Sequence, residues 1–495
     1  MQSENLIAVD LGASSGRVVS GKFDGKYIET KEQLRFSNMP VDIADGLYWD
    51  YIKIFQQIKY GLSIAYKDVG KISSMGVDTW GVDYGFLTNK NEILFAPHSY
   101  RDTRDRDYET IFLSRITKKE LFKSTGSQYS LINSNVQLFA DIQRYPFIKD
   151  NAKQILMMPN LINFLFSGKL VNEFTITSTS GLLKNNEVNW NYDVIKRLDL
   201  PVKWFKKIQI GKNIGNIKSS IIQELQINQD INVIAGAGHD TAAALLALPI
   251  TTKDREKTAF ISCGTWSIVG NQTQGTVTND IAFDLGLTNE GCFDGTNRLL
   301  KNITGLWIIQ ELQKEWSYKG NVVTFEQMVA EASEVKNNNL YIDVDDDSFT
   351  TPNQMEEKII NFLRKTDQKT DITRGQLLRL VLESLAFAYK DVINSLEQAT
   401  GKQLQSIHMF GGGIQNKLLV QLTADFSQKK TITGPVEASV IGNMVSQLIS
   451  TNDYNVDSIV PVLRNSFEIN TVVPRTVNNL SEKFDKFKKI KNSIK

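Results

Sequence analysis

The chain has 495 residues with nearly balanced charge, 56 Lys and Arg against 55 Asp and Glu. One hydrophobic core does not organise a chain of this length, so two domains are expected. The charge balance predicts neither a nucleic-acid partner nor a membrane surface as partner. A group of lysines near the end is interpreted as the exposed face of a terminal helix; it comprises Lys483, Lys486, Lys488, Lys489 and Lys491.

Targeting signals and soft-metal ligands are both scarce in the sequence. It has no run of about 20 apolar residues and no signal-peptide pattern, so we expect a cytoplasmic protein. The two cysteines, Cys263 and Cys292, exclude a disulfide framework and fit a reducing compartment. His98, His239 and His408 lie too far apart in sequence to indicate a zinc site. Any metal should therefore be a hard cation bound by oxygen.

The first half of the chain alternates between strand and helix patterns. The expected order is a buried strand at 6–10, a turn at 12–16, strands at 17–23 and 27–36, a helix at 50–66 and a strand at 72–77. Residues 105–200 form a mixed, mostly helical region rich in aromatic side chains. This alternation predicts an α/β fold.

The second half repeats the opening arrangement. The expected order is a strand at 258–263, a turn at 264–265 and a strand at 266–272, then a helix at 375–398, a strand at 406–410 and helices at 415–427 and 437–450. The repetition predicts two halves of similar plan. We place the boundary near Leu248 and Pro249, with domains at 1–246 and 247–470 and a helical tail at 471–495.

Two turns of small and hydroxyl residues, each at the end of a predicted strand, can hold phosphate through backbone N–H groups. The first follows Asp10 and covers residues 12–17, and the second covers residues 262–267. Asp10 can hold Mg²⁺ through water, because this ion keeps several of its water ligands. The spacing is not that of a Walker P-loop. An ordinary tight hairpin is the alternative interpretation of both turns.

A run of three glycines, residues 411–413, follows a predicted strand and precedes a predicted helix. Glycine lets the backbone pass close to a flat or anionic ligand, so adenine and ribose are the expected ligand groups here. A flexible loop without ligand is the alternative.

Two further segments carry side chains suited to a sugar and its phosphorylation. Asp240, in the segment 238–241, lies near the start of a predicted helix, where it could cap the helix or accept a hydroxyl proton. Residues 78–85 combine carboxylates, a hydroxyl, aromatic rings and glycines, which suits a sugar ring, although a β-turn with buried aromatics has the same composition. Residues 98–104 could add polar contacts or form a salt-bridged surface loop.

Taken together and in order, these segments resemble the FGGY carbohydrate kinase family across nearly the full chain. The matching segments are VDLGASSGR (9–17), GVDTWGVDYG (76–85), YRDTR (100–104), GHDTA (238–242), SCGTWS (262–267), TNEG (288–291), LKNITGLWIIQ (300–310), GGGIQN (411–416), LTADF (422–426) and GPVEAS (434–439). The resemblance implies an actin-like ATPase fold with two ribonuclease-H-like domains around a deep cleft. The chain departs from the family pattern at Cys263, where a serine is usual, and at Ile414, where a small or polar residue is common.

The resemblance also implies a role for individual residues. Asp240 would be the general base. The ketose would contact Gly81, His239, Asp240, Thr241, Asp78, Trp80 and Asp83. ATP would contact Ala13, Ser14, Ser15, Gly16, Arg17, Thr265, Asn302, Gln310 and Gly412, with Mg²⁺ held by Asp10 through water.

The reaction that follows from the resemblance is transfer of the γ-phosphoryl group of ATP to the C1 hydroxyl of a ketose, with L-rhamnulose as the leading substrate. L-fuculose, L-ribulose and D-xylulose are alternatives within the same reaction class. An actin-like regulatory or binding protein that uses the nucleotide as a switch is the alternative from another class. We expect a monomer, because closure of two domains needs no partner subunit.

Overall fold

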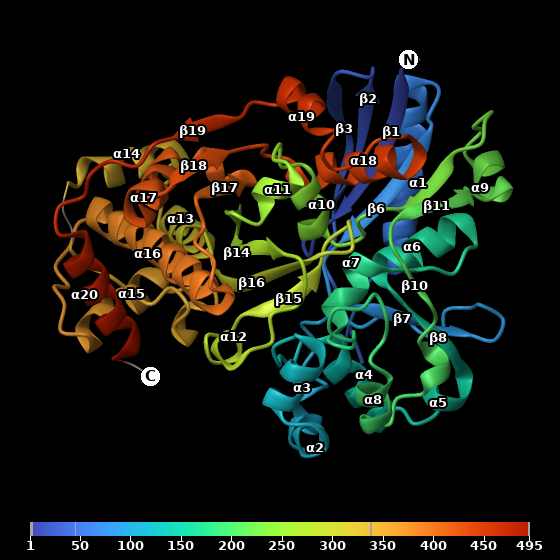
Figure 1. The fold of residues 1–495 in the computed structure, drawn as a ribbon, viewed down its shortest axis with the longest axis horizontal. Helices are drawn as coiled ribbons and strands as arrows, with labels where there is room; N and C mark the ends of the chain where they lie inside the picture. The colour runs from blue at the N-terminus through green and yellow to red at the C-terminus, as the bar shows by residue number, and fades with distance from the viewer. Residues whose placement is uncertain (1–2, 45, 337–338, 494–495) are drawn as a thin grey trace. The chain divides into compact units, whose positions relative to one another are not determined.

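The computed structural model describes residues 3–44, 46–336 and 339–493 (Figure 1). The chain forms two compact units. Unit 1 comprises Met1–Thr252, Gln272–Leu299 and Glu437–Phe467, and unit 2 comprises Lys253–Asn271, Leu300–Val436 and Glu468–Lys495. These units differ from the expected division at residue 246, because segments 272–299 and 437–467 pack with the N-terminal part of the chain.

Unit 1 is built on a mixed sheet with the strand order β11-β12-β6-β1-β2-β3. Its strands are β1 (Glu4–Leu11), β2 (Ser15–Phe23), β3 (Ile28–Ser37), β6 (Ser74–Thr79), β11 (Lys212–Asn216) and β12 (Asn232–Ala235). The first three strands form the expected antiparallel meander, and β6 pairs with β1 and β12 in parallel. The central strands are apolar and buried, as expected for the parallel part of a sheet covered on both faces.

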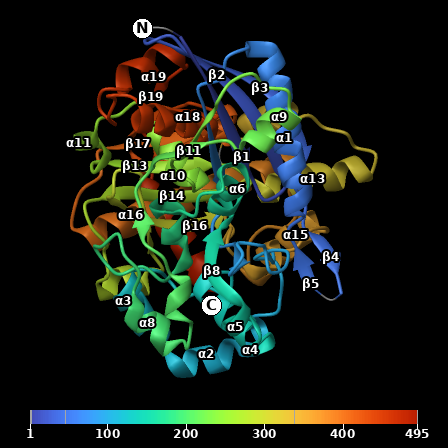
Figure 2. The same cartoon turned by 90° about the vertical axis from the view of Figure 1, so that its right-hand side faces the viewer.

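Alternation along β1 divides its side chains between two faces of this sheet. Ile7, Val9 and Leu11 belong to a core cluster shared with helix α1 (Tyr51–Val69), which lies along β2 and β3 in Figure 2. Helix α18 (Ala438–Thr451) packs on β1 and β6, and also on helix α10 (Asp240–Leu246). Asp10 lies on the α18 face of the sheet, because its carboxylate accepts a hydrogen bond from Ser439.

A second lobe of unit 1 surrounds a separate aromatic core. Its elements include β7 (Tyr84–Thr88), α2 (Glu109–Arg115), α3 (Lys118–Thr125), α4 (Ser134–Arg144), β8 (Ala152–Met157), α7 (Phe174–Thr177) and α8 (Tyr192–Arg197). Strand β8 lies within the region expected to be mostly helical and pairs antiparallel with β7. Its pairing partner lies far away in sequence, which local patterns do not reveal.

Unit 2 repeats the arrangement of a hairpin beside a parallel strand. Its sheet includes, in order, β16 (Asn297–Thr304), β14 (Trp266–Thr273), β13 (Thr258–Cys263), β17 (Ser406–Phe410), β18 (Lys430–Thr433) and β19 (Asn470–Val472). The hairpin β13–β14 is antiparallel, and β17 pairs with β13 in parallel. Helices α16 (Arg374–Thr400) and α17 (Lys417–Ser427) pack against each other (Figure 1). The expected strand, turn and helix order is therefore present in both halves.

Helix α16 shows how local sequence sets an element's limits. Thr373 and Gln376 form a capping box at its start, and Gly401 ends it in the left-handed conformation. The terminal helix α20 (Leu480–Asn492) carries the expected lysines, but only Lys488 and Lys489 are exposed, whereas Lys491 is half-buried and pairs with Asp391. Among the described residues, no helix is long and apolar enough to cross a membrane.

Close packing of α18 against α10 depends on Gly442. A Cβ atom at this position would lie 1.6 Å from the backbone oxygen of Ala243. We therefore expect Gly442→Ala to force the two helices apart and lower the thermal midpoint of unfolding, since overpacking costs about 1–3 kcal/mol or more. Thr451→Ala, at an exposed position of the same helix, should change the midpoint little. Equal midpoints for the two variants would contradict this account.

Candidate functional site

Parallel pairing of β1 and β6 brings two carboxylates together at the end of the unit 1 sheet. Asp10 and Asp78 are register partners near the carboxyl ends of these strands. Asp78 is fully buried, and its pKa is raised well above the ordinary value by burial and by the charges of Asp10 and Asp240. Three carboxylates therefore share one region of unit 1, and the charged form of the innermost is disfavoured.

Asp10 is held by a positive charge and by helix α18. Its Oδ2 accepts hydrogen bonds from Arg17 Nε at 3.1 Å and from Ser439 Oγ at 3.1 Å. Arg17 also forms ion pairs with Asp10 and with Glu437, just before α18. Its cationic head is thereby fixed beside the turn between β1 and β2.

The turn between β1 and β2 is stabilised by its own backbone and by Asn38. Gly12 N donates to Ser15 O at 2.9 Å, and the Asn38 side chain donates to Gly12 O at 2.7 Å. Ser14 is exposed and Ala13 half-buried, so the outer part of the turn is accessible. A small, accessible turn beside a fixed arginine is suited to phosphate.

Asp78 lies beneath the site surface rather than at it. Its Oδ2 accepts a hydrogen bond of 2.6 Å from Asn443 Nδ2 on α18, and Gln447 donates to Asn443 Oδ1 at 2.8 Å. Gln447 also accepts from Ser74 and donates to Ile7 O. Complete burial of Asp78 does not support the expected direct contact with sugar, and its side chain instead joins the sheet to α18.

Asp83 is likewise buried, and its oxygens are occupied. Its Oδ2 accepts from Trp49 Nε1 at 2.6 Å, Trp80 Nε1 at 2.9 Å and Tyr100 N at 3.1 Å, while Oδ1 accepts from Gln137 at 3.2 Å. Burial raises its pKa to about 6. The two indole rings lie 4.0 Å apart between centroids. Asp83 therefore orients this tryptophan pair, and the structure does not support its expected contact with sugar.

Gly81 is half-buried and remains compatible with a ligand. A Cβ atom there would lie 3.1 Å from the Thr179 side chain, whose Oγ1 accepts from Val82 N at 2.9 Å. The segment 98–104 is only partly exposed, because Arg101 and Thr103 lie at the surface whereas His98 and Ser99 are buried. Arg104 is buried and donates to Asp141 Oδ1 at 2.7 Å.

Asp240 begins helix α10, and the residue before it, His239, occupies the N-cap position without a side-chain capping bond. Oδ1 of Asp240 accepts from Thr241 N at 2.5 Å and from Thr241 Oγ1 at 3.1 Å. The Asp240 side chain keeps 37% of its surface exposed, in contrast to buried Asp78 and Asp83. Desolvation of this carboxylate, together with the charge of Asp10, raises its pKa above the ordinary value, which increases its proton affinity. A partly exposed carboxylate with raised proton affinity is compatible with a general base.

The loop before α10 is fixed by buried groups that sequence reasoning missed. Glu173, at the start of α7, accepts from Gly238 N at 3.2 Å, and Thr175 Oγ1 accepts from His239 N at 3.2 Å. Thr79 N donates to Gly238 O at 2.9 Å. No local pattern marks Glu173 or Thr175, because they reach this loop only in the folded chain.

In unit 2, the structure places two of the four nucleotide residues expected there, Thr265 and Gln310, in direct contact. Thr265 Oγ1 donates to Gln310 Oε1 at 3.1 Å, and Gly305 N donates to Thr265 O at 3.1 Å. Gly411 has φ +87, and a Cβ atom there would lie 2.9 Å from Cys263 O, so the glycine turn packs on the β13–β14 hairpin. Gly412 in that turn is exposed, and Asn302 is exposed on β16.

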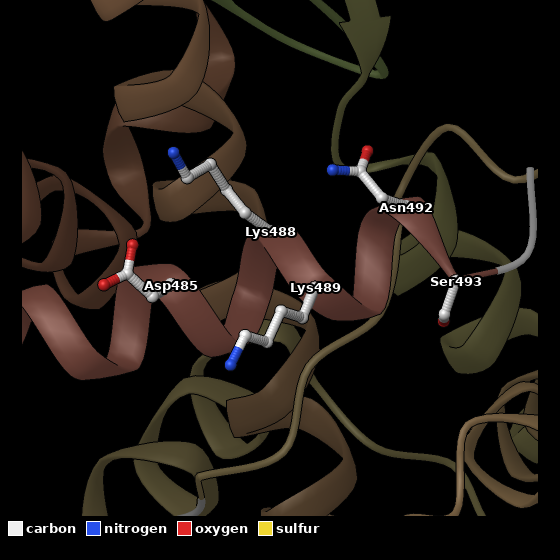
Figure 3. Close-up of a pocket in the computed structure, with 5 residues that line it drawn as sticks. All are labelled: Asp485, Lys488, Lys489, Asn492 and Ser493. Atoms are coloured by element: carbon white, nitrogen blue, oxygen red, sulfur yellow. The ribbon is translucent and has the colours of Figure 1, made fainter.

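A separate hollow lies on the terminal helix of unit 2 (Figure 3). It is lined by Asp485, Lys488, Lys489, Asn492 and Ser493. None of the expected site residues lines it, and its lysines belong to the solvated face of α20. Within the described part of the chain, no group of three or more His, Cys, Asp and Glu side chains is placed to hold a metal ion.

Comparison with known families identifies the chain. Residues 5–247 match the N-terminal domain of the FGGY family of carbohydrate kinases, and residues 259–451 match its C-terminal domain. The chain belongs to this family. The resemblance noted in the sequence is thereby confirmed.

Similar curated proteins cover almost the whole chain. A rhamnulokinase of Oceanobacillus iheyensis is 35% identical over 480 residues, covering 96% of this chain and 100% of that protein. A rhamnulokinase of Bacteroides thetaiotaomicron is 33% identical, covering 91% of each chain. A rhamnulokinase of Halalkalibacterium halodurans is 33% identical, covering 94% of this chain and 98% of that protein.

Solved structures of low sequence identity share the fold. A xylulose kinase from Rhodospirillum rubrum has a TM-score of 0.79 at 14% identity, covering 99% of this chain and 98% of that one. Plasmodium falciparum glycerol kinase with ADP has a TM-score of 0.79 at 15% identity, covering 98% and 97%. A gluconate kinase from Lactobacillus acidophilus has a TM-score of 0.77 at 15% identity, covering 99% and 96%. The expected α/β, actin-like ATPase fold is confirmed.

The role of Asp83 can be tested by an isosteric change. Asp83→Asn replaces one acceptor oxygen by an NH₂ group that must face a donor, so a buried hydrogen bond is lost at a cost of about 1–3 kcal/mol. We expect a lower thermal midpoint and an altered near-UV circular dichroism spectrum from the Trp49–Trp80 pair. Asp107→Asn, the same change at an exposed position, should alter neither quantity. An unchanged tryptophan signal in Asp83→Asn would show that Asp83 does not orient the rings.

Proposed function

We propose that the chain is an ATP-dependent sugar kinase that phosphorylates the C1 hydroxyl of L-rhamnulose, giving L-rhamnulose 1-phosphate for L-rhamnose catabolism. The observation that carries this proposal is the similarity to three rhamnulokinases, at 33–35% identity over at least 91% of this chain. The carboxylate at Asp240 and the fixed turn at residues 12–17 supply the groups that such a reaction needs.

In the proposed reaction, Asp240 accepts the proton of the attacking C1 hydroxyl. Thr241 occupies Oδ1 of this carboxylate, so Oδ2 is the oxygen directed to the substrate in our proposal. A raised proton affinity suits a base that accepts the proton late, since the hydroxyl loses its proton as the bond to phosphorus forms. We assign the remaining ketose contacts to Gly81, Trp80, His239 and Thr241.

We assign the β- and γ-phosphates to residues 13–16 and Arg17. Their backbone donors and the guanidinium neutralise negative charge on the transferred group. We assign the rest of the nucleotide to four residues of unit 2. These are Thr265, Asn302, Gln310 and Gly412.

Mg²⁺ is the metal that the family implies, and the donor set at Asp10 fits it. The ligand atoms available there are carboxylate oxygens, and Asp10 remains close to the accessible turn, with its Oδ2 already bonded to Arg17 and Ser439. We propose that Asp10 holds the hydrated ion through water. When bound, Mg²⁺ would add positive charge beside the phosphates.

We further propose that the enzyme works as a monomer in the cytoplasm. Cys263 and Cys292 are both buried and form no disulfide in the structure, as a reducing compartment allows. All groups proposed for catalysis belong to a single chain. Analytical ultracentrifugation of the purified protein would test the oligomeric state.

The role of Asp240 predicts a selective loss of turnover. Asp240→Asn removes the base while keeping the size of the side chain, so kcat should fall by about 10²–10⁴-fold with ATP affinity nearly unchanged. Turnover is measured by coupled ADP release and ATP affinity by calorimetry. Asp280→Asn, the same change on an exposed residue of unit 1, serves as the control and should retain wild-type turnover. Wild-type turnover in Asp240→Asn would refute the assignment.

The choice of sugar predicts the outcome of a substrate panel. With Mg-ATP, L-rhamnulose should give a higher kcat/KM for ADP release than L-fuculose, L-ribulose, D-xylulose or glycerol. A different preferred ketose would keep the kinase and discard L-rhamnulose. ATP hydrolysis that no sugar stimulates would instead favour a nucleotide-dependent switch.

A further inference from the structure

A buried arginine contacts the histidine next to Asp240. Arg298, at the start of β16 and within unit 1, has a side chain with 0% of its surface exposed. Its Nη2 lies 2.6 Å from Nδ1 of His239. The family resemblance gave no role to Arg298, and no sequence pattern connects it to His239, which lies 59 residues earlier.

The direction of this hydrogen bond follows from the chemistry of the two groups. A guanidinium carries five N–H donors and no acceptor, so Nδ1 of His239 must accept. A neutral imidazole that accepts at Nδ1 carries its proton at Nε2. Burial lowers the pKa of His239 below its ordinary value, which favours the neutral ring. His239 is therefore neutral and protonated at Nε2.

The other charged groups around His239 do not compete for Nδ1. Glu290 Oε2 lies 3.7 Å from Nδ1, beyond hydrogen-bond distance, and instead pairs with Nη2 of Arg298. Nη1 of Arg298 donates to the backbone oxygen of Gly291. The two hydrogens on Nη2 thus serve Glu290 and His239, so Glu290 directs the arginine towards the imidazole.

The opposite side of the imidazole faces the proposed base. Nε2 of His239 lies 3.4 Å from Oδ1 of Asp240. With the proton on Nε2, the ring offers a donor beside a carboxylate that accepts. In the other tautomer, Nδ1–H would oppose the Arg298 donor, and Nε2 would be a second acceptor beside Asp240.

Backbone hydrogen bonds fix the loop before α10, but they do not orient the imidazole ring of His239. Thr175 and Glu173 hold the peptide N–H groups of His239 and Gly238. No side-chain capping bond forms at His239. Rotation of the imidazole is therefore controlled from its Nδ1 side, where Arg298 lies.

We propose that Arg298 is a positioning residue that fixes His239 as the Nε2–H tautomer, so that His239 donates a hydrogen bond to a ketose oxygen while Asp240 alone accepts the proton. The hydrogen bond to a ketose rests on the proposed function. The tautomer itself can be measured without any substrate.

The first test is two-bond ¹H–¹⁵N NMR of the full-length protein labelled with ¹⁵N-histidine, at neutral pH and without ligands. The chain has only three histidines, and the His239 signals are assigned from the His239→Gln variant. We expect a protonated Nε2 and an unprotonated Nδ1 for His239 in the wild type. A wild-type signal showing Nδ1–H or a charged imidazolium would overturn the proposal, whatever the enzyme's substrate.

The second test removes the arginine donor. In Arg298→Met, we expect a mixture of His239 tautomers and a fall of about 10–100-fold in kcat/KM for the ketose, as for loss of other groups that orient a site residue. The KM for ATP should stay near the wild-type value. Arg298→Lys retains a donor and should recover part of the Nε2–H population.

The matched control separates the hydrogen bond from the ion pair. Glu290→Gln removes the negative charge beside Arg298 but leaves the donor to Nδ1, so His239 should remain the Nε2–H tautomer. If Arg298→Met kept the pure Nε2–H tautomer, Arg298 would not be the positioning residue. If tautomers shifted as expected but no sugar stimulated ADP release in the wild type, the proposed function alone would fail. If Arg298→Met does not fold, the wild-type spectrum and Arg298→Lys still decide the proposal.

Discussion

The parallel pairing of β1 with β6 is the constraint on which the rest of the unit 1 site depends. It places Asp10 and Asp78 side by side at the ends of two buried strands. Two adjacent carboxylates in a buried position are costly unless one is neutral or both find donors. Asn443, Ser439 and Arg17 supply these donors. A polar face on helix α18 is thus a requirement of the site and a reason for segment 437–467 to pack in unit 1.

The same helix supports the proposed base. Gly442 of α18 allows the backbone of α10 to approach closely, and α10 begins at Asp240. Helix α18 therefore holds Asp10 through its first turn, Asp78 through its middle and α10 through its packing face. One rigid element determines the spacing between the phosphate-binding turn and Asp240 in this proposal, which is how a scaffold pre-organises reacting groups.

The sequence predicted correctly those elements whose limits depend on residues close together in the chain. Strand β1, the turn after it and helix α16 are set by residues close in sequence, and their positions were predicted within a few residues. Asp10 and Asp240 could also be proposed as site residues from the sequence, because each is a carboxylate at a predicted strand end or helix start. Arg298, Glu173 and Trp49 were missed. Each reaches the site from a distant segment, and only the folded chain brings them together.

Asp78 and Asp83 show that the residue types in a segment do not reveal which side chains can reach a ligand. Both lie in a polar, aromatic segment that indicates a sugar site, yet one faces α18 and the other faces two indoles. The four aspartates of this region have the same residue type, and their different surroundings give them different roles. Asp10 is paired with a cation, Asp78 is buried where charge is disfavoured, Asp83 accepts hydrogen bonds at both oxygens, and Asp240 keeps a partly exposed side chain. A general base must reach its substrate and keep a lone pair available. Among these four aspartates, Asp240 best meets both requirements, which supports the role proposed for it.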